Sequence, residues 1–195
     1  MKRFVRHIAM SLIAGLICLQ GSVSAQESQS VYPGGQATML STGSVKMSTD
    51  LITVSLPIRI DFSIDPNQTG NAAFRSDEGV ISVISGNNLA LHLMGIKAAD
   101  GTSAKVVSPD QFSDSDWENL SAEQTVANIA LGLKTSQGTI WSLPEVGNDM
   151  TQSCGAYDLN GYPLHRVYMD AKYGRAWPAD MALDYIIYLR IVSQD

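Results

Sequence analysis

The clearest pattern in this sequence is a strict alternation of apolar and polar residues over positions 52–64. Period two places every second side chain on one face of a β-strand, whereas an α-helix would spread the same residues around its circumference. Pro57 has no N–H to donate to a neighbouring strand, so we expect this strand to lie at a sheet edge or to break there into two. A second alternating stretch, 181–191, predicts an equally regular last strand. The apolar positions of the first stretch are Ile52, Val54, Leu56, Ile58, Ile60, Phe62 and Ile64.

Shorter apolar segments between these two stretches predict further strands. Turn sequences rich in glycine and asparagine separate several of them. Strands that each bury one face combine most simply as two packed sheets, so we expect an all-β fold, a Greek-key β-sandwich of about seven to nine strands. A barrel is the alternative. The segments are 80–85, 89–98, 127–135, 139–143 and 164–173.

One segment, 115–126, carries helix signals. Ser115 with Glu118, and Ser121 with Gln124, both have the spacing of a capping box, in which each side chain satisfies a backbone N–H of the other residue. The β pattern resumes at 127, so we expect one short helix within a single β-sandwich domain that covers 45–195.

The first 25 residues have the parts of a cleavable signal peptide. A basic start is followed by an uncharged apolar stretch over 8–19, and small residues precede Gln26. That stretch is shorter than the roughly 20 residues of a membrane-spanning helix. We therefore expect residues 1–25 to be removed on export, and residues 26–44, rich in polar side chains and glycine, to form a flexible lead-in.

Export leaves an acidic chain with one cysteine. None of the 19 acidic residues and three of the 13 basic residues precede Gln26, so the exported chain has ten basic residues and a formal net charge of −9. This charge argues against nucleic acid and against docking on anionic lipid as partners. Of the two cysteines, Cys18 lies in the signal peptide, so Cys154 has no partner for an intramolecular disulfide.

An acidic run is the candidate metal site. Carboxylates on a loop can converge on calcium, which takes six to eight oxygen ligands. The run lacks the glycine and the final glutamate of an EF-hand loop, and the same carboxylates could instead cap a helix and favour its positive end. The candidate ligands are Asp110, Asp114, Asp116 and Glu118.

Two other chemistries have candidate residues. Cys154 with His165 has the residue types of a thiol nucleophile and its base, although the sequence around Cys154 matches no cysteine-protease signature. His92 alternates with apolar residues, which is typical of a buried or interface histidine. A carbohydrate-binding module would need several aromatic side chains on one exposed face, while most aromatic residues of a sandwich lie in its core. The candidates for stacking are Trp117, Trp141, Trp177, Tyr168, Tyr173, Tyr185 and Tyr188.

The lead-in also suggests self-assembly. Residues 26–44 run directly into the strand that contains Pro57, and an edge strand offers unpaired N–H and C=O groups to a strand from another molecule. The alternative is that 26–44 acts as a plain spacer.

Three segments resemble a known family. The stretches 52–66, 117–135 and 173–191 resemble secreted β-sandwich surface proteins of Gram-positive bacteria, a group related to WxL-type cell-wall-associated domains, and residues 141–143 spell one W-x-L motif. The resemblance implies an extracellular or wall-associated location and no known catalysis.

We therefore expect a non-enzymatic cell-surface protein without a cofactor that binds a surface protein or glycan, or assembles with itself. A carbohydrate-binding module is the first alternative, and a metal-dependent or thiol enzyme is the second.

Overall fold

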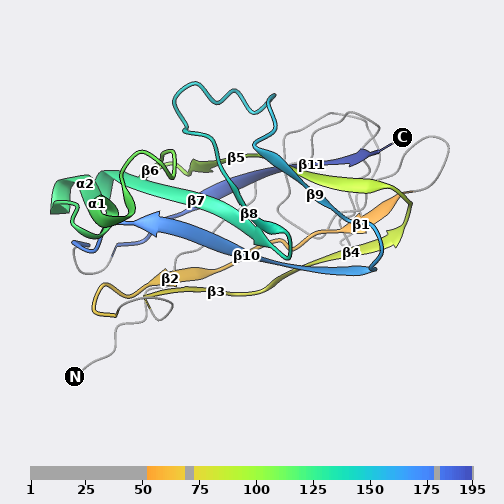
Figure 1. Ribbon diagram of the computed structural model, residues 1–195, viewed down its shortest axis with the longest axis horizontal. Coiled ribbons are helices and arrows are strands. Elements are labelled where there is room, and N and C mark those ends of the chain that lie inside the picture. Colours follow the sequence, from red (N-terminus) through yellow and green to blue (C-terminus); the bar gives the residue numbers. More distant parts are fainter. Residues whose placement is uncertain (1–51, 69–72, 178–180, 195) are drawn as a thin grey trace.

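A computed structural model describes residues 52–68, 73–177 and 181–194. The signal peptide and the lead-in at 26–44 lie outside these residues, so the predictions made for them stay predictions. The described residues form eleven strands and two short helices (Figure 1). The all-β sandwich expected from the alternating pattern is confirmed.

Most strands are short, and three are long. The long ones are β5 (Leu89–Ala98), β10 (Leu164–Tyr173) and β11 (Tyr185–Ser193), and the helices lie beyond the end of β10 in Figure 1. The others are β1 (Thr53–Ser55), β2 (Phe62–Ile64), β3 (Phe74–Ser76), β4 (Gly79–Ser85), β6 (Lys105–Val106), β7 (Asn128–Thr135), β8 (Gly138–Trp141) and β9 (Gly155–Asp158), with helices α1 (Asp114–Glu118) and α2 (Ala122–Ala127) between β6 and β7.

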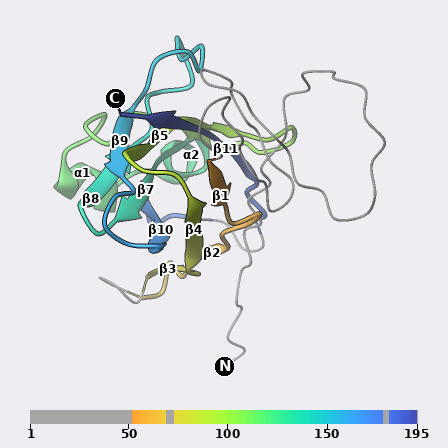
Figure 2. The same cartoon turned by 90° about the vertical axis from the view of Figure 1, so that its right-hand side faces the viewer.

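The strands form two main sheets and a small hairpin. The larger sheet has the order β1-β4-β10-β7-β6, with β8 also paired to β7, and the smaller one has the order β11-β5-β9. Strands β4 and β10 pair although five strands separate them in the chain, as Greek-key connections require. The strand pairs among the described residues are antiparallel, except that β6 pairs with β7 in parallel. Figure 2 shows β11, β5 and β9 as one layer above the other strands.

The first alternating stretch lines the core, but as two strands. Val54 and Phe62 are both buried, and the chain between β1 and β2 bends outward at Pro57 and Ile58. Ile58 was expected on the buried face and is 43% exposed, because the chain bends at this residue between β1 and β2. The alternation resumes directly afterwards, since Ile60 and Phe62 are buried. The edge position expected for this strand is correct, since β1 is the outermost strand of its sheet within the described residues.

The helical segment differs from the prediction in one capping residue. Ser121 caps α2 in a complete capping box with Gln124, as expected. Ser115, however, lies inside α1, and Ser113 is the N-cap instead, its hydroxyl accepting a hydrogen bond from the backbone N–H of Asp116. The segment therefore forms two short helices where one was predicted.

Candidate functional site

The acidic run forms a loop and a helix that are anchored by Trp117. This side chain is buried, its indole N–H donates to the carbonyl of Pro109 over 3.0 Å, and its ring packs edge-on against Phe112. Leu120 and Ala130 complete the cluster, so α1 rests on the outer face of β7. Trp117 is thus a packing residue, and it has no free face for stacking on a sugar.

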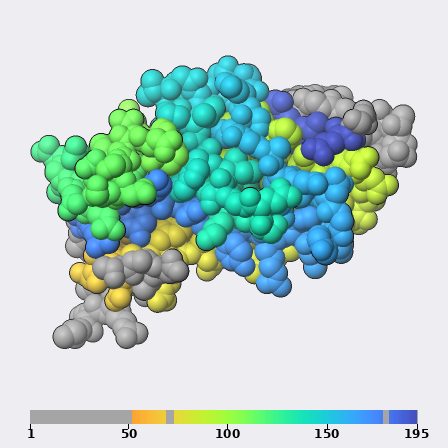
Figure 3. Space-filling model, in the orientation of Figure 1, coloured from red at the N-terminus to blue at the C-terminus, as the bar shows by residue number. Residues whose placement is uncertain are grey.

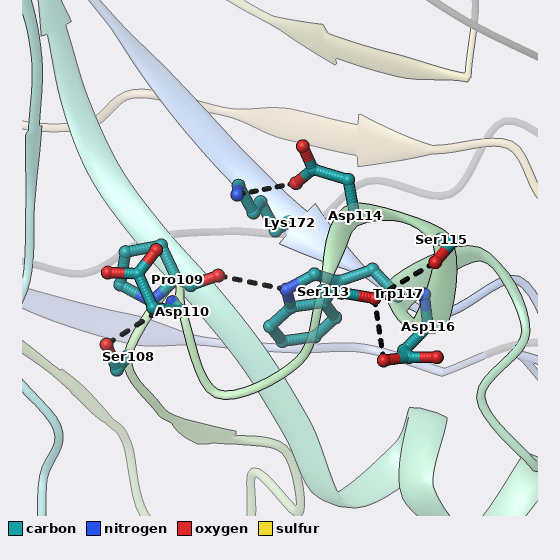
Figure 4. Close-up of polar contacts among 9 residues, drawn as sticks. All are labelled: Ser108, Pro109, Asp110, Ser113, Asp114, Ser115, Asp116, Trp117 and Lys172. Carbon is teal, nitrogen blue, oxygen red and sulfur yellow. Dashed lines mark hydrogen bonds and ion pairs between the residues drawn. The ribbon is translucent and has the colours of Figure 1, made fainter.

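Three of the four candidate calcium ligands, Asp110, Asp114 and Asp116, point in different directions (Figure 4). Asp114 pairs with Lys172 on β10 at 2.8 Å, and Asp116 accepts a hydrogen bond from the capping hydroxyl of Ser113 at 2.6 Å. Asp110 lies on the far side of Trp117 from both of them. Among the described residues, no group of three or more histidine, cysteine or acidic side chains is positioned to hold a metal ion.

The fourth carboxylate, Glu118, pairs with Arg175 at 3.1 Å. Asp114 and Glu118 are therefore each paired with a basic side chain. Lys172 lies near the end of β10, and Arg175 lies two residues after the strand ends. The helix-capping alternative is correct in part: Asp114 and Asp116 lie in the first turn of α1, although Ser113 is its N-cap. The ion pairs with Lys172 and Arg175 were not expected from the sequence.

These ion pairs border an open cleft of about 250 Å³ at the helix-bearing end of the molecule. Its walls come from the hairpin of β2 and β3, from α1 and from the end of β10. Tyr173 contributes an aromatic side chain, and burial raises its pKa to about 12, so the hydroxyl stays neutral. The charged lining residues are Asp65, Asp114, Glu118, Lys172 and Arg175.

Cys154 and His165 are each held by other partners. The Cys154 sulfur accepts a hydrogen bond from the Leu143 N–H, and burial raises the pKa of this thiol. The His165 ring is buried, with Nε2 at 3.0 Å and 2.9 Å from two backbone carbonyls and Nδ1 at 3.0 Å from the Tyr157 hydroxyl. A thiol that stays protonated is a poor nucleophile, and this histidine is engaged at both ring nitrogens.

His92 lies in the centre of the smaller sheet and contacts a serine. Its Nδ1 is 2.9 Å from the Ser153 hydroxyl, which also interacts with the backbone of Gly155. Burial, and then the charge of Arg190 on the neighbouring strand, lower the pKa of His92. The sequence predicted a buried or interface histidine at position 92. The His92 side chain is half-buried, so this prediction is partly correct.

The remaining aromatic candidates do not form an exposed platform in the described residues. Trp177 and Tyr185 are buried, and the Tyr185 hydroxyl donates to the Ala104 carbonyl. The other four are only half-buried and lie on different strands or strand ends, namely Trp141, Tyr168, Tyr173 and Tyr188.

An exposed apolar patch, which the sequence reasoning missed, lies on the outer face of β4 and β10. It consists of Val80, Ile84 and Leu164, which are 40%, 67% and 59% exposed. Leu164 stands opposite Ser82 in the register, so its diagonal neighbours on β4 are Val80 and Ile84, and the three form one β4–β10 patch. In Figure 3 the blue β10 and yellow-green β4 lie side by side at the lower right.

The signal for this patch was present in the sequence. Strand β4 has apolar residues at both odd and even positions over 80–84, although a strand of a two-layer sandwich needs apolar residues on one face only. A segment this short, with apolar residues at both odd and even positions, predicts a strand but does not indicate which of its faces is exposed.

A polar cluster borders the patch. Glu78 accepts hydrogen bonds from Arg166 at 2.6 Å and from the Tyr168 hydroxyl at 2.8 Å. The hydrogen bond from Tyr168, followed by the contacts with Arg166, lowers the pKa of Glu78, so this carboxylate stays ionised. Since Arg166 stands opposite Val80, this Glu78 cluster begins where the β4–β10 patch ends.

No family model, curated protein or solved structure matches this chain. The resemblance to WxL-type domains therefore stays a prediction. In the part of the chain that the structure describes, no helix has the length and apolar character needed to cross a membrane.

Proposed function

We propose that this protein is a non-enzymatic, exported β-sandwich that works at a cell surface by binding a partner through the β4–β10 patch. The signal-peptide pattern of residues 1–25 supports export, and the acidic composition of the remaining chain argues against nucleic acid and anionic lipid as partners.

The observation that carries the proposal is the exposure of three neighbouring large apolar side chains. Single exposed apolar residues are ordinary on protein surfaces, but adjoining ones that cross two strands mark interaction sites. The opposite end of the same sheet face is covered by Trp117 of α1 and by Leu120, which lies between the two helices. The middle of this face carries the Glu78 cluster. At the β4–β10 end of this face no helix of the described residues covers the sheet, and Ile84 and Leu164 are open to solvent.

The test is binding of the exported protein to the surface of the cells that produce it. We expect Leu164→Lys and Ile84→Lys to weaken binding about tenfold or more, because each places a charge in the centre of an apolar contact. The matched control is Val146→Lys. Val146 is 87% exposed and belongs to the loop between β8 and β9. Figure 2 shows this loop on the side of the molecule away from β4.

Equal binding by all four proteins would overturn the assignment of this patch, and so would a wild-type protein that binds no surface preparation. The substituted side chains are exposed, so we expect all three variants to keep the melting temperature of the wild type.

A further inference from the structure

We propose that the partner of the β4–β10 patch is a second copy of the same chain. This inference rests on the function proposed for this face. The two copies pack face to face about a two-fold axis that passes through the patch, so that each contributes Val80, Ile84 and Leu164.

The first argument is geometric. A two-fold contact uses the same residues twice and therefore needs a patch that can pack against itself. Leu164 lies between its diagonal neighbours Val80 and Ile84, with the small side chain of Ser82 directly opposite it. The patch therefore alternates protruding side chains with a shallow position, and inverted copies of such a surface can interdigitate at the roughly 10 Å spacing of stacked sheets.

The second argument is charge. The exported chain, with ten basic and 19 acidic residues, has a formal net charge of −9, so contact between two copies is repulsive over most of the surface. The β4–β10 patch has no charged residue, and the Glu78 cluster beside it pairs one carboxylate with the guanidinium of Arg166. This border is both neutral and self-complementary, because Glu78 of each copy can face Arg166 of the other. A partner selected by opposite charge would instead need a border of one sign.

The third argument concerns the affinity of the two copies for each other. Three side chains form a small interface, and interfaces below about 1,200 Å² are weak and transient. We therefore expect a dimer that forms at high concentration. Crowding of many copies on one surface supplies such a concentration without any further contact.

The experiment is sedimentation equilibrium of the exported protein at concentrations up to about 1 mM, the range in which weak association is measurable. We expect the wild type and Val146→Lys to dimerise equally, and Ile84→Lys and Leu164→Lys to dimerise about tenfold or more weakly. Glu78→Arg or Arg166→Glu alone gives the border one sign and weakens the dimer, while the double variant restores it.

Three results would overturn the inference. The first is a wild type that stays monomeric at every concentration. The second is a dimer that Ile84→Lys and Leu164→Lys leave unchanged. The third is a dimer that is lost when the chain starts at Ser44, which assigns association to residues 26–43. The proposed function is judged separately, by cell-surface binding, so a monomeric wild type whose surface binding is lost in Leu164→Lys would show that the patch binds an unlike partner.

Discussion

Ile58 and Ile60 are the same residue type two positions apart in one alternating stretch, yet the structure buries one and exposes the other. Ile60 is 4% exposed, and one of its methyl groups lies against Gly79. We expect Ile60→Ala to lower the free energy of unfolding by about 2–5 kcal/mol, because it leaves a cavity in the core. Ile58→Ala should cost under about 1 kcal/mol, as expected for a partly exposed site. Chemical denaturation of both variants measures the difference, and similar losses would place Ile58 in the core after all.

His92 makes stability depend on pH. Burial and Arg190 lower its pKa below the ordinary 6.5, so the unfolded chain takes up the proton more readily than the folded chain. The stability that depends on the neutral ring is complete above pH 6.5 and is lost as the pH falls below that value toward the folded-state pKa. We expect urea denaturation to show a larger loss between pH 7 and pH 5 for the wild type than for His92→Gln. An identical pH dependence in the two proteins would remove His92 as the cause.

At the scale of elements, the two serines with capping-box spacing provide a matched pair. Ser121→Ala removes the hydroxyl that accepts from the Gln124 N–H, and should lower the free energy of unfolding by about 1 kcal/mol. Ser115→Ala should change it by less than about half a kcal/mol, because Ser115 is not the N-cap of α1. Thermal or chemical denaturation distinguishes the two, and a larger loss for Ser115→Ala would contradict the capping assignment.

The elements that could be predicted are those whose sequence repeats a burial pattern. The stretches 52–64 and 181–191 alternate because one face of each is buried along most of its length. Strands β3, β6 and β9 have four residues or fewer, too few for a period to be visible. They exist because neighbouring strands pair with them, which is a property of the whole fold.

The same limit applies to the candidate site. The acidic residues of α1 could be named from the sequence, but their basic partners could not. Lys172 follows Asp114 by 58 residues, and the two meet because β10 pairs with β7 beside the helices. Likewise, the β4–β10 patch exists only because Leu164 is brought next to a strand that lies some 80 residues earlier in the chain.

At the scale of the whole molecule, the first test is the length of the exported chain. We expect the secreted protein to begin at Gln26, because small residues stand before it at the positions that a signal peptidase reads. Intact-mass measurement of protein recovered outside the cell decides this. A mass that includes residues 1–25 would contradict export by cleavage, and would leave the chain attached through its N-terminus.

Pro57 has a consequence for how such a chain survives outside the cell. A protein that folds after export passes through a stage in which its strands are formed but not yet covered, and a flat apolar edge of thirteen residues would template aggregation at that stage. With proline near its centre, the 52–64 stretch forms two edge strands of three residues each, β1 and β2, in place of one long edge. The residue that interrupts the most regular pattern in the sequence thus shortens the strand edges on which copies of this chain could grow into fibrils.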